Sequence, residues 1–249
     1  FYVVIYIQVN IVKKSLKIGV FAYNWPHQKT QSGIFNLCVS GFKPEIALCA
    51  DPVKLNFYKS QVRIGPKDLY VHNTTDLCKY FNIKSVVLKH NSKECEKIIK
   101  NMNLDIGIVL GARILKDNII NSFNIGIINM HPGILPENRG LDNLKWAVIK
   151  GMKQGVTSHL IDGSIDRGRM IDQQIVKVYK DDTLVDIHLR LQNKEQQMMI
   201  EALGKIQEMK SLEDFPLLSH GKNYHRSVPP EIEKNLFENF KSYKENLGE

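Results

Sequence analysis

This sequence of 249 residues has few cysteines, and their spacing points to neither a metal site nor a redox motif. The histidines at positions 131 and 159 also have no Cys or Glu partner at the spacing of metal ligands. We therefore expect reduced thiols, a cytoplasmic location and no bound metal. The four cysteines concerned are Cys38, Cys49, Cys78 and Cys95.

The apolar stretch at the start of the chain, residues 1–12, is too short to span a bilayer, which takes about 20 residues. Its charge order also differs from that of a secretion signal, because Lys13 and Lys14 follow the apolar run instead of preceding it. We expect no membrane partner. Residues 1–15 are predicted to form an extra N-terminal strand or a non-native leader.

Acidic residues are outnumbered, with 26 Asp and Glu against 34 Lys and Arg, so the net charge is +8. The basic residues are scattered, without a long Lys/Arg block or interleaved aromatic residues, and a nucleic-acid partner is not expected. A basic surface also steers anionic small substrates toward a cleft. Composition by itself does not separate these two classes of partner.

Strand and helix patterns alternate along most of the chain, which predicts an α/β protein with a doubly wound, mostly parallel sheet. Ligands of such sheets bind at the carboxyl ends of the strands. The predicted strands are residues 17–23, 44–50, 85–88, 105–110, 124–130, 155–162 and 170–178. The predicted helices are residues 34–40, 74–81, 92–102, 115–122, 141–150 and 183–209.

One catalytic domain, residues 16–209, is expected, followed by a helical extension over residues 210–249. In the extension, Pro229 and Pro230 precede an amphipathic helix predicted at residues 231–243. This helix either packs back on the domain or forms the contact of a homodimer. Its apolar side is predicted to carry Ile232, Leu236, Phe237 and Phe240.

The segment from residue 127 to residue 140 is the most informative part of the sequence. It begins as a buried strand, stops at Pro132 and places Asn129 and His131 two residues apart, on one face of the strand. An amide can polarise a carbonyl, and an imidazole can move a proton near neutral pH. The alternative is that both side chains only tie down the turn before Pro132.

A carboxylate, Asp166, follows on a glycine-flanked loop between the strands at 155–162 and 170–178. An Asp in such a loop is usually a turn former. The combination with Asn129 and His131 gives it more weight as a functional residue.

In their order along the chain, these fragments resemble the folate-dependent formyltransferase family, and the resemblance covers about residues 17–191. It implies a Rossmann-like formyltransferase fold. The matching fragments are Gly111-Ala112-Arg113-Ile114-Leu115, Asn129-Met130-His131-Pro132, Leu135-Pro136, Gly140, Gly155-Val156-Thr157-Ser158-His159, Asp166-Arg167-Gly168, Gln173 or Gln174, and Asp182-Thr183.

The resemblance implies an enzyme that uses 10-formyltetrahydrofolate as formyl donor, with Asn129, His131 and Asp166 as catalytic residues. Asn129 would donate to the formyl oxygen, and His131 would stabilise the oxyanion or take the proton of the amine. Asp166 would orient His131 or a water molecule and help to relay the proton. Donor binding is implied for the family's folate loop, here Gly111, Arg113, Ile114 and Leu115.

The acceptor amine differs between branches of this family. In the purine-synthesis branch a glycine-rich loop binds the phosphate of glycinamide ribonucleotide, whereas Pro26 stands in that loop here and removes a donor. The tail is shorter than the further domain of the initiator-tRNA branch, and residues 1–16 are too few for the regulatory domain of the formylfolate hydrolase branch. Residues 135–140 are similar to the sugar branch, which predicts a nucleotide-linked amino-deoxysugar as acceptor.

Candidate acceptor-binding residues are Trp25, Asn138 and Arg139, and an aromatic residue such as Phe57 in the long polar segment 51–73 could stack on a base or sugar. Two other functions stay open. The chain could formylate glycinamide ribonucleotide, with the phosphate held by Lys29 or Arg139. It could also be a catalytically silent binding module on the same fold.

Overall fold

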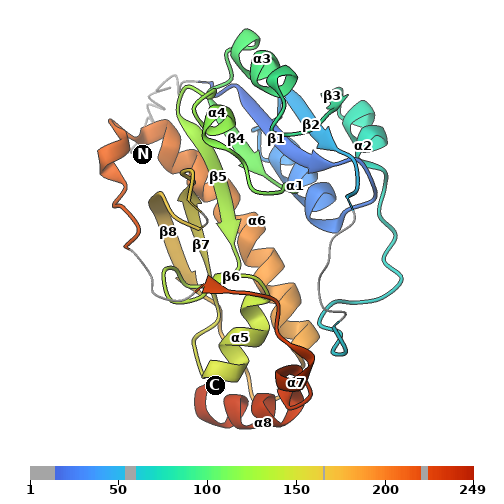
Figure 1. Ribbon diagram of the computed structural model, residues 1–249, viewed down its shortest axis with the longest axis vertical. Helices are drawn as coiled ribbons and strands as arrows, with labels where there is room; N and C mark the ends of the chain where they lie inside the picture. Colours follow the sequence, from blue (N-terminus) through green and yellow to red (C-terminus); the bar gives the residue numbers. More distant parts are fainter. Residues whose placement is uncertain (1–14, 54–59, 165, 220–223) are drawn as a thin grey trace, which may run out of the picture.

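The computed structural model describes residues 15–53, 60–164, 166–219 and 224–249. Its centre is a seven-stranded sheet with the order β3-β2-β1-β4-β5-β7-β8 (Figure 1). The strands β1 to β5 are parallel, whereas β7 and β8 are antiparallel to their neighbours, so the predicted sheet is confirmed. The bounds are β1 Ile18–Tyr23, β2 Ile46–Ala50, β3 Lys84–Val87, β4 Ile106–Val109, β5 Gly126–His131, β7 Gly155–Leu160 and β8 Arg169–Ile175.

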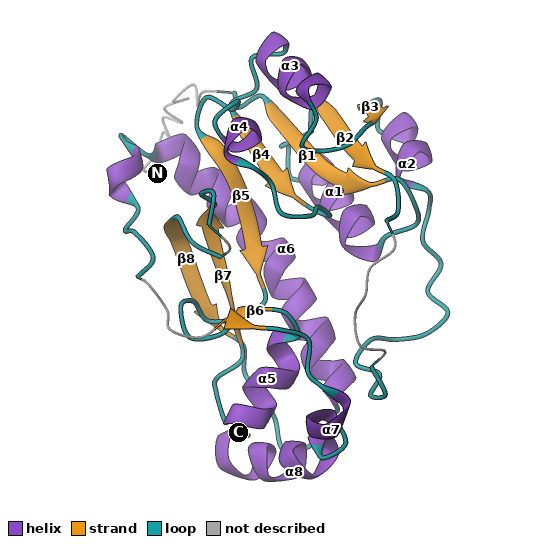
Figure 2. Ribbon diagram, viewed as in Figure 1, coloured by secondary structure: helices purple, strands orange, loops and turns teal. Residues whose placement is uncertain are grey.

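Helices cover both faces of the sheet, because successive side chains of a buried strand point to opposite faces (Figure 2). Val20 packs in the core formed with α1 and α6, while its neighbour Phe21 packs in the core formed with α3 and α4. The helices concerned are α1 (Gln28–Val39), α2 (Thr74–Tyr80), α3 (Lys93–Asn101), α4 (Asp117–Ile120) and α6 (Leu184–Glu208).

Helix α1 begins six residues earlier than the prediction of residues 34–40, which placed Gly33 in a loop. The ring of His27 caps the helix by accepting a hydrogen bond from the backbone N–H of Thr30. Gly33 lies inside the helix, where a Cβ would be 2.3 Å from the side chain of Leu110. The glycine therefore allows close packing of α1 on the sheet instead of forming a turn.

The C-terminal segment forms two helices, α7 (Pro230–Glu233) and α8 (Leu236–Leu247), where one was predicted. Helix α8 packs against α5 (Asn143–Lys150), and the Tyr243 hydroxyl donates to the carbonyl of Met152 at 2.7 Å. Phe237, predicted on the apolar side, is 64% exposed. The break between the two helices gives α8 a different buried side, formed by Leu236, Phe240 and Tyr243.

A short parallel pair of strands, β6 (Arg139–Gly140) and β9 (Tyr224–His225), joins the C-terminal segment to the end of β5 (Figure 1). The 3-10 helix η1 (Leu212–Asp214) precedes β9 in the chain. No strand or helix can be assigned to the expected N-terminal extension, because residues 1–14 lie outside the described part of the chain.

Within the described ranges, no helix is both long and apolar enough to cross a bilayer. Over the same residues, His, Cys, Asp and Glu side chains form no group of three or more that could hold a metal ion.

Candidate active site

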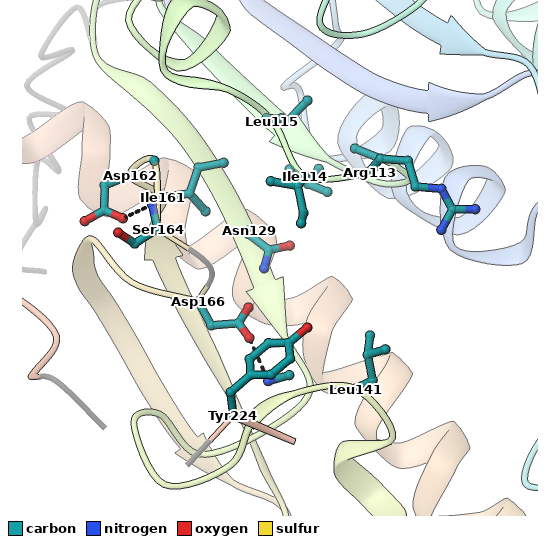
Figure 3. A pocket seen from close by; sticks show the side chains of 14 residues that line it. Arg113, Ile114, Leu115, Asn129, Leu141, Ile161, Asp162, Ser164, Asp166 and Tyr224 are labelled. Atoms are coloured by element: carbon teal, nitrogen blue, oxygen red, sulfur yellow. Dashed lines mark hydrogen bonds between the residues drawn. The ribbon is translucent and has the colours of Figure 1, made fainter. Parts of the chain in front are cut away.

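A cavity of about 250 Å³ lies at the carboxyl ends of β4 and β5. Asn129 of β5 and Asp166 of the β7–β8 loop line it together with the segments 112–115 and 161–164 (Figure 3). From β1 the sheet extends through β2 and β3 on one side and through β4 and β5 on the other. The strand order therefore reverses between β1 and β4, and the cavity lies next to this topological switch point. The sequence predicted a site at this edge.

The amide of Asn129 is oriented by His159, the residue directly opposite it on β7. The ring Nδ1 of His159 is 2.8 Å from the carbonyl of Arg167, so Nδ1 carries the hydrogen and donates it. Nε2 is then the acceptor for Nδ2 of Asn129 at 3.3 Å. Burial, and next the charge of His131, lower the pKa of His159 to about 4, which keeps the ring neutral and able to accept.

The imidazole of His131 is held between Asp166 and the loop that follows β5. Its Nε2 is 2.7 Å from the carbonyl of Asn138, and its Nδ1 is 3.4 Å from Oδ1 of Asp166. The short contact with a carbonyl assigns the hydrogen to Nε2. Nδ1 is therefore the nitrogen that can take up a proton, and Asp166 stands beside it to stabilise the resulting charge.

Asp166 has a φ of 50°, in the left-handed region that Asp tolerates better than most residues. Its Oδ2 accepts a hydrogen bond of 2.7 Å from the backbone N–H of Gly140. Burial by itself would raise the pKa of Asp166, but the hydrogen bond and charge that His131 provides when Nδ1 is protonated, together with the N–H of Gly140, outweigh it. The pKa lies below its ordinary value, so the carboxylate is ionised at neutral pH.

The turn after β5 is fixed by Thr157, which lies opposite His131 on β7. The Thr157 hydroxyl donates to the carbonyl of Gly133 at 2.7 Å and accepts from the backbone N–H of Leu135 at 3.1 Å. Gln173, and not Gln174, adds a hydrogen bond of 2.8 Å to the carbonyl of Leu135. The Gly-x-Thr-x-His fragment thus holds both the turn and Asn129.

The predicted donor loop forms one wall of the cavity. Arg113, Ile114 and Leu115 line it, whereas Gly111 lies behind the wall, with its Cα so close to Tyr23 that a Cβ would be 2.7 Å from the ring. Asn91, which the sequence did not single out, braces this loop. Its side chain donates to the carbonyl of Ile114 at 2.8 Å and accepts from the N–H of Lys116 at 2.9 Å.

The three predicted acceptor-binding residues do not line this cavity. Trp25 is stacked on Tyr23, with ring centroids 4.1 Å apart. Asn138 and Arg139 are buried, and the side chain of Asn138 bonds to the carbonyl of Asn143 at 2.9 Å. Phe57 lies outside the described residues.

Tyr224, from the C-terminal strand β9, lines the cavity beside Asp166 and was not predicted from the sequence (Figure 3). It is 45% exposed, so its ring is accessible to a ligand. No motif surrounds it in the sequence. Only its pairing opposite Arg139 brings it to the cavity.

A family model described as formyl transferase matches residues 66–203, more than half of the chain. The chain belongs to the formyl transferase family.

Two curated relatives are methionyl-tRNA formyltransferases. The one from Caldanaerobacter subterraneus subsp. tengcongensis is 31% identical over 122 residues, which cover 48% of this chain and 40% of the relative. The one from Azobacteroides pseudotrichonymphae is 34% identical over 93 residues, covering 37% and 29%. The chain thus matches less than half the length of these relatives.

Solved structures of formyltransferases share the fold of this chain at low sequence identity. Phosphoribosylglycinamide formyltransferase from Anaplasma phagocytophilum has a TM-score of 0.63 and 19% identity, and 84% of this chain and 97% of that chain are covered. A sugar N-formyltransferase from a Shewanella species has a TM-score of 0.58 and 20% identity, with 84% and 76% covered. Structures from both branches share the fold, with TM-scores of 0.63 and 0.58, so the fold does not select an acceptor.

Proposed function

We propose that this chain transfers a formyl group from 10-formyltetrahydrofolate to the primary amine of a nucleotide-linked amino-deoxysugar. The observation that carries the proposal is the shared cavity. An oriented amide, Asn129, and an ionised carboxylate, Asp166, face the same space as the loop of Arg113, Ile114 and Leu115. Formyl transfer requires a polarised carbonyl and a group that handles the proton of the amine.

The cavity suits the ring end of the donor. Its volume of about 250 Å³ is below the range of about 300–1,000 Å³ for pockets that enclose a drug-sized ligand. The ring system would therefore enter while the rest of the molecule extends toward solvent. Ile114, Leu115 and Ile161 supply apolar walls for a flat ring. When bound, the donor supplies the activated formyl group.

Asn129 is assigned the role of oxyanion donor. One N–H of its amide is bonded to His159, and a primary amide has a second N–H that can donate to the formyl oxygen. A hydrogen-bond donor that is already oriented needs no reorganisation as negative charge develops on that oxygen.

Asp166 attracts the ammonium form of the acceptor. His131 does not line the cavity, but its Nδ1 lies 3.4 Å from Oδ1 of Asp166, which does. The proton released by the amine would be held between these two groups and would leave with the deformylated donor.

Two features support an acceptor other than glycinamide ribonucleotide. The ring of His27 occupies the N–H of Thr30 in the first turn of α1, so this turn has one donor fewer for a phosphate. Lys29, which could have bound a phosphate by charge, is paired with Glu195 at 2.7 Å and also donates to the carbonyl of Met130. The similarity of residues 135–140 to the sugar branch supports the amino sugar.

A competition experiment tests the proposal. Purified protein receives 10-formyltetrahydrofolate with equal concentrations of a nucleotide-linked amino sugar, glycinamide ribonucleotide and methionyl-tRNA, and products are identified by mass. The formylated sugar is the expected main product, and Asn129→Ala is the matched control. Formylated glycinamide ribonucleotide or methionyl-tRNA as main product would refute the sugar acceptor but not formyl transfer. Complete inactivity over a wide acceptor panel would favour the silent binding module.

A further inference from the structure

The C-terminal strand β9 is attached directly to the loop that holds the catalytic histidine. The backbone N–H of Leu141 donates to the carbonyl of His225 at 2.8 Å. Gly140 has a φ of 101°, and a Cβ there would be 2.1 Å from the carbonyl oxygen of His225. Glycine is therefore required at this position because the backbone of β9 passes so close to it.

The ring of His225 is fixed in one orientation and one tautomer. Nζ of Lys150 is 2.8 Å from Nε2, and an ammonium group only donates, so Nε2 accepts and the ring hydrogen is on Nδ1. Nδ1 then donates to Oδ1 of Asn138 at 3.2 Å. The ring is also stacked on Trp146, with centroids 5.0 Å apart. Burial, and next the charge of Lys150, lower the pKa of His225 and keep the ring neutral.

Asn138 connects His225 to His131. Its carbonyl accepts from Nε2 of His131 at 2.7 Å and from the side-chain amide of Asn143 at 2.8 Å. Its side-chain amide accepts a hydrogen bond from Nδ1 of His225 and donates one to the carbonyl of Asn143. The residue is 2% exposed, so its carbonyl has a fixed direction.

We propose that His225 is a positioning residue for formyl transfer: through Asn138 it keeps the hydrogen of His131 on Nε2 and turns Nδ1 toward Asp166. The proposal rests on the proposed function, because it assigns His131 its part in that reaction. It makes the segment after residue 223 part of the active site, although it lies outside the residues that match the family.

Four variants test this linkage. His225→Ala removes the donor to Asn138, and His225→Asn restores an amide N–H near the place of Nδ1. Lys150→Met removes the bond that fixes the tautomer, together with the contact of the ammonium group with the ring of Trp146. Lys153→Met is the matched control on an exposed lysine just after α5. All should fold, because backbone groups of β9 and the following residues keep their bonds to Leu141, Trp146 and Asp142. Thermal unfolding checks this.

We expect His225→Ala to lower kcat by about 10- to 100-fold with KM little changed, the scale of a small misplacement of a catalytic group. His225→Asn should recover most of that loss. Lys150→Met should lose less than His225→Ala, and Lys153→Met should match the wild type. The acid limb of the kcat–pH profile should also move in His225→Ala, because the surroundings of His131 change when Asn138 loses its bond to His225. Wild-type kcat and an unmoved pH profile in His225→Ala would overturn the proposal.

A second measurement does not depend on turnover. Nitrogen-15 NMR of histidine-labelled protein reports which ring nitrogen of His131 carries the hydrogen. The wild type and His225→Asn should show it on Nε2, and His225→Ala should show a mixture of the two tautomers. The same tautomer in His225→Ala as in the wild type would overturn the linkage. If the wild type formylates no acceptor in the panel, the proposed function fails, and the NMR comparison alone decides the linkage.

Discussion

Lys145 on α5 and Glu233 on α7 form an ion pair buried inside the protein, and removing the lysine should destabilise the fold strongly. Nζ and Oε1 are 2.6 Å apart, and the side chains are 3% and 1% exposed. Breaking a buried pair by removing one partner costs about 3–5 kcal/mol, because the other charge stays buried. In Lys145→Met, Glu233 would keep the hydroxyl of Ser60 at 2.6 Å and the N–H of Gln61 at 2.7 Å. We therefore expect the lower end, about 3 kcal/mol.

For a chain of this size, a loss of about 3 kcal/mol lowers the melting temperature by roughly 6–12 °C. Urea unfolding at pH 7 and thermal unfolding measure the two quantities. The control is Lys100→Met, which breaks the exposed pair of Lys100 with Glu96 and should change neither quantity measurably. The double variant Lys145→Met/Glu233→Gln should lose less than Lys145→Met, because it leaves no unpaired charge. A loss in Lys145→Met below about 1 kcal/mol would refute the reasoning.

The same pair gives stability a pH dependence with a definite sign. Burial by itself would raise the pKa of Glu233, but hydrogen bonds from Lys145, Ser60 and Gln61 outweigh it, so the pKa is below its ordinary value. A carboxylate of this kind contributes its full stability above its pKa in the unfolded chain, and the contribution is lost as the pH falls through the lower, folded pKa. The difference between wild type and Lys145→Met should therefore shrink in acid.

Three further predictions concern the active site. Replacing His131 by Asn or Asp166 by Asn should lower turnover by about a hundredfold or more while leaving the protein folded, and near-wild-type turnover in either variant would remove that residue from the catalytic set. Asn129→Ala should lower kcat by about 10²- to 10³-fold with KM nearly unchanged, and a variant whose main defect is a raised KM would show that Asn129 only holds substrate. Gly140→Ala should destabilise the protein by about 1–3 kcal/mol in urea unfolding, because its Cβ would be 2.1 Å from the carbonyl of His225. Wild-type stability in Gly140→Ala would show that β9 can move away from the added Cβ without a loss in the free energy of unfolding.

Where sequence predictions missed, a tertiary contact was the cause. Gly33 was placed in a loop, but it lies inside α1, where Leu110 leaves no room for a Cβ although glycine is a poor helix former. The helix predicted at residues 231–243 is broken before Leu236. On the earlier side of that break, Glu233 bonds to Lys145, and this pairing of residues 88 positions apart has no local signal.

The sequence by itself determined the alternation of strands and helices, because the apolar runs and periodicities that specify them are local. It also determined that Asn129 and His131 lie on one face at a strand end, since side chains two apart in a strand share a face. The position of Asp166 in the cavity, as a loop residue of the next strand pair, followed from the motif order.

Only the tertiary structure decided how these groups are oriented. The bond between Asn129 and His159 joins residues 30 positions apart, and the bond between His225 and Asn138 joins residues 87 apart. Tyr224 reaches the cavity only because β9 pairs with β6. Such contacts depend on which strands become neighbours and in what register, and this is settled by packing of the whole chain rather than by the propensities of the residues involved.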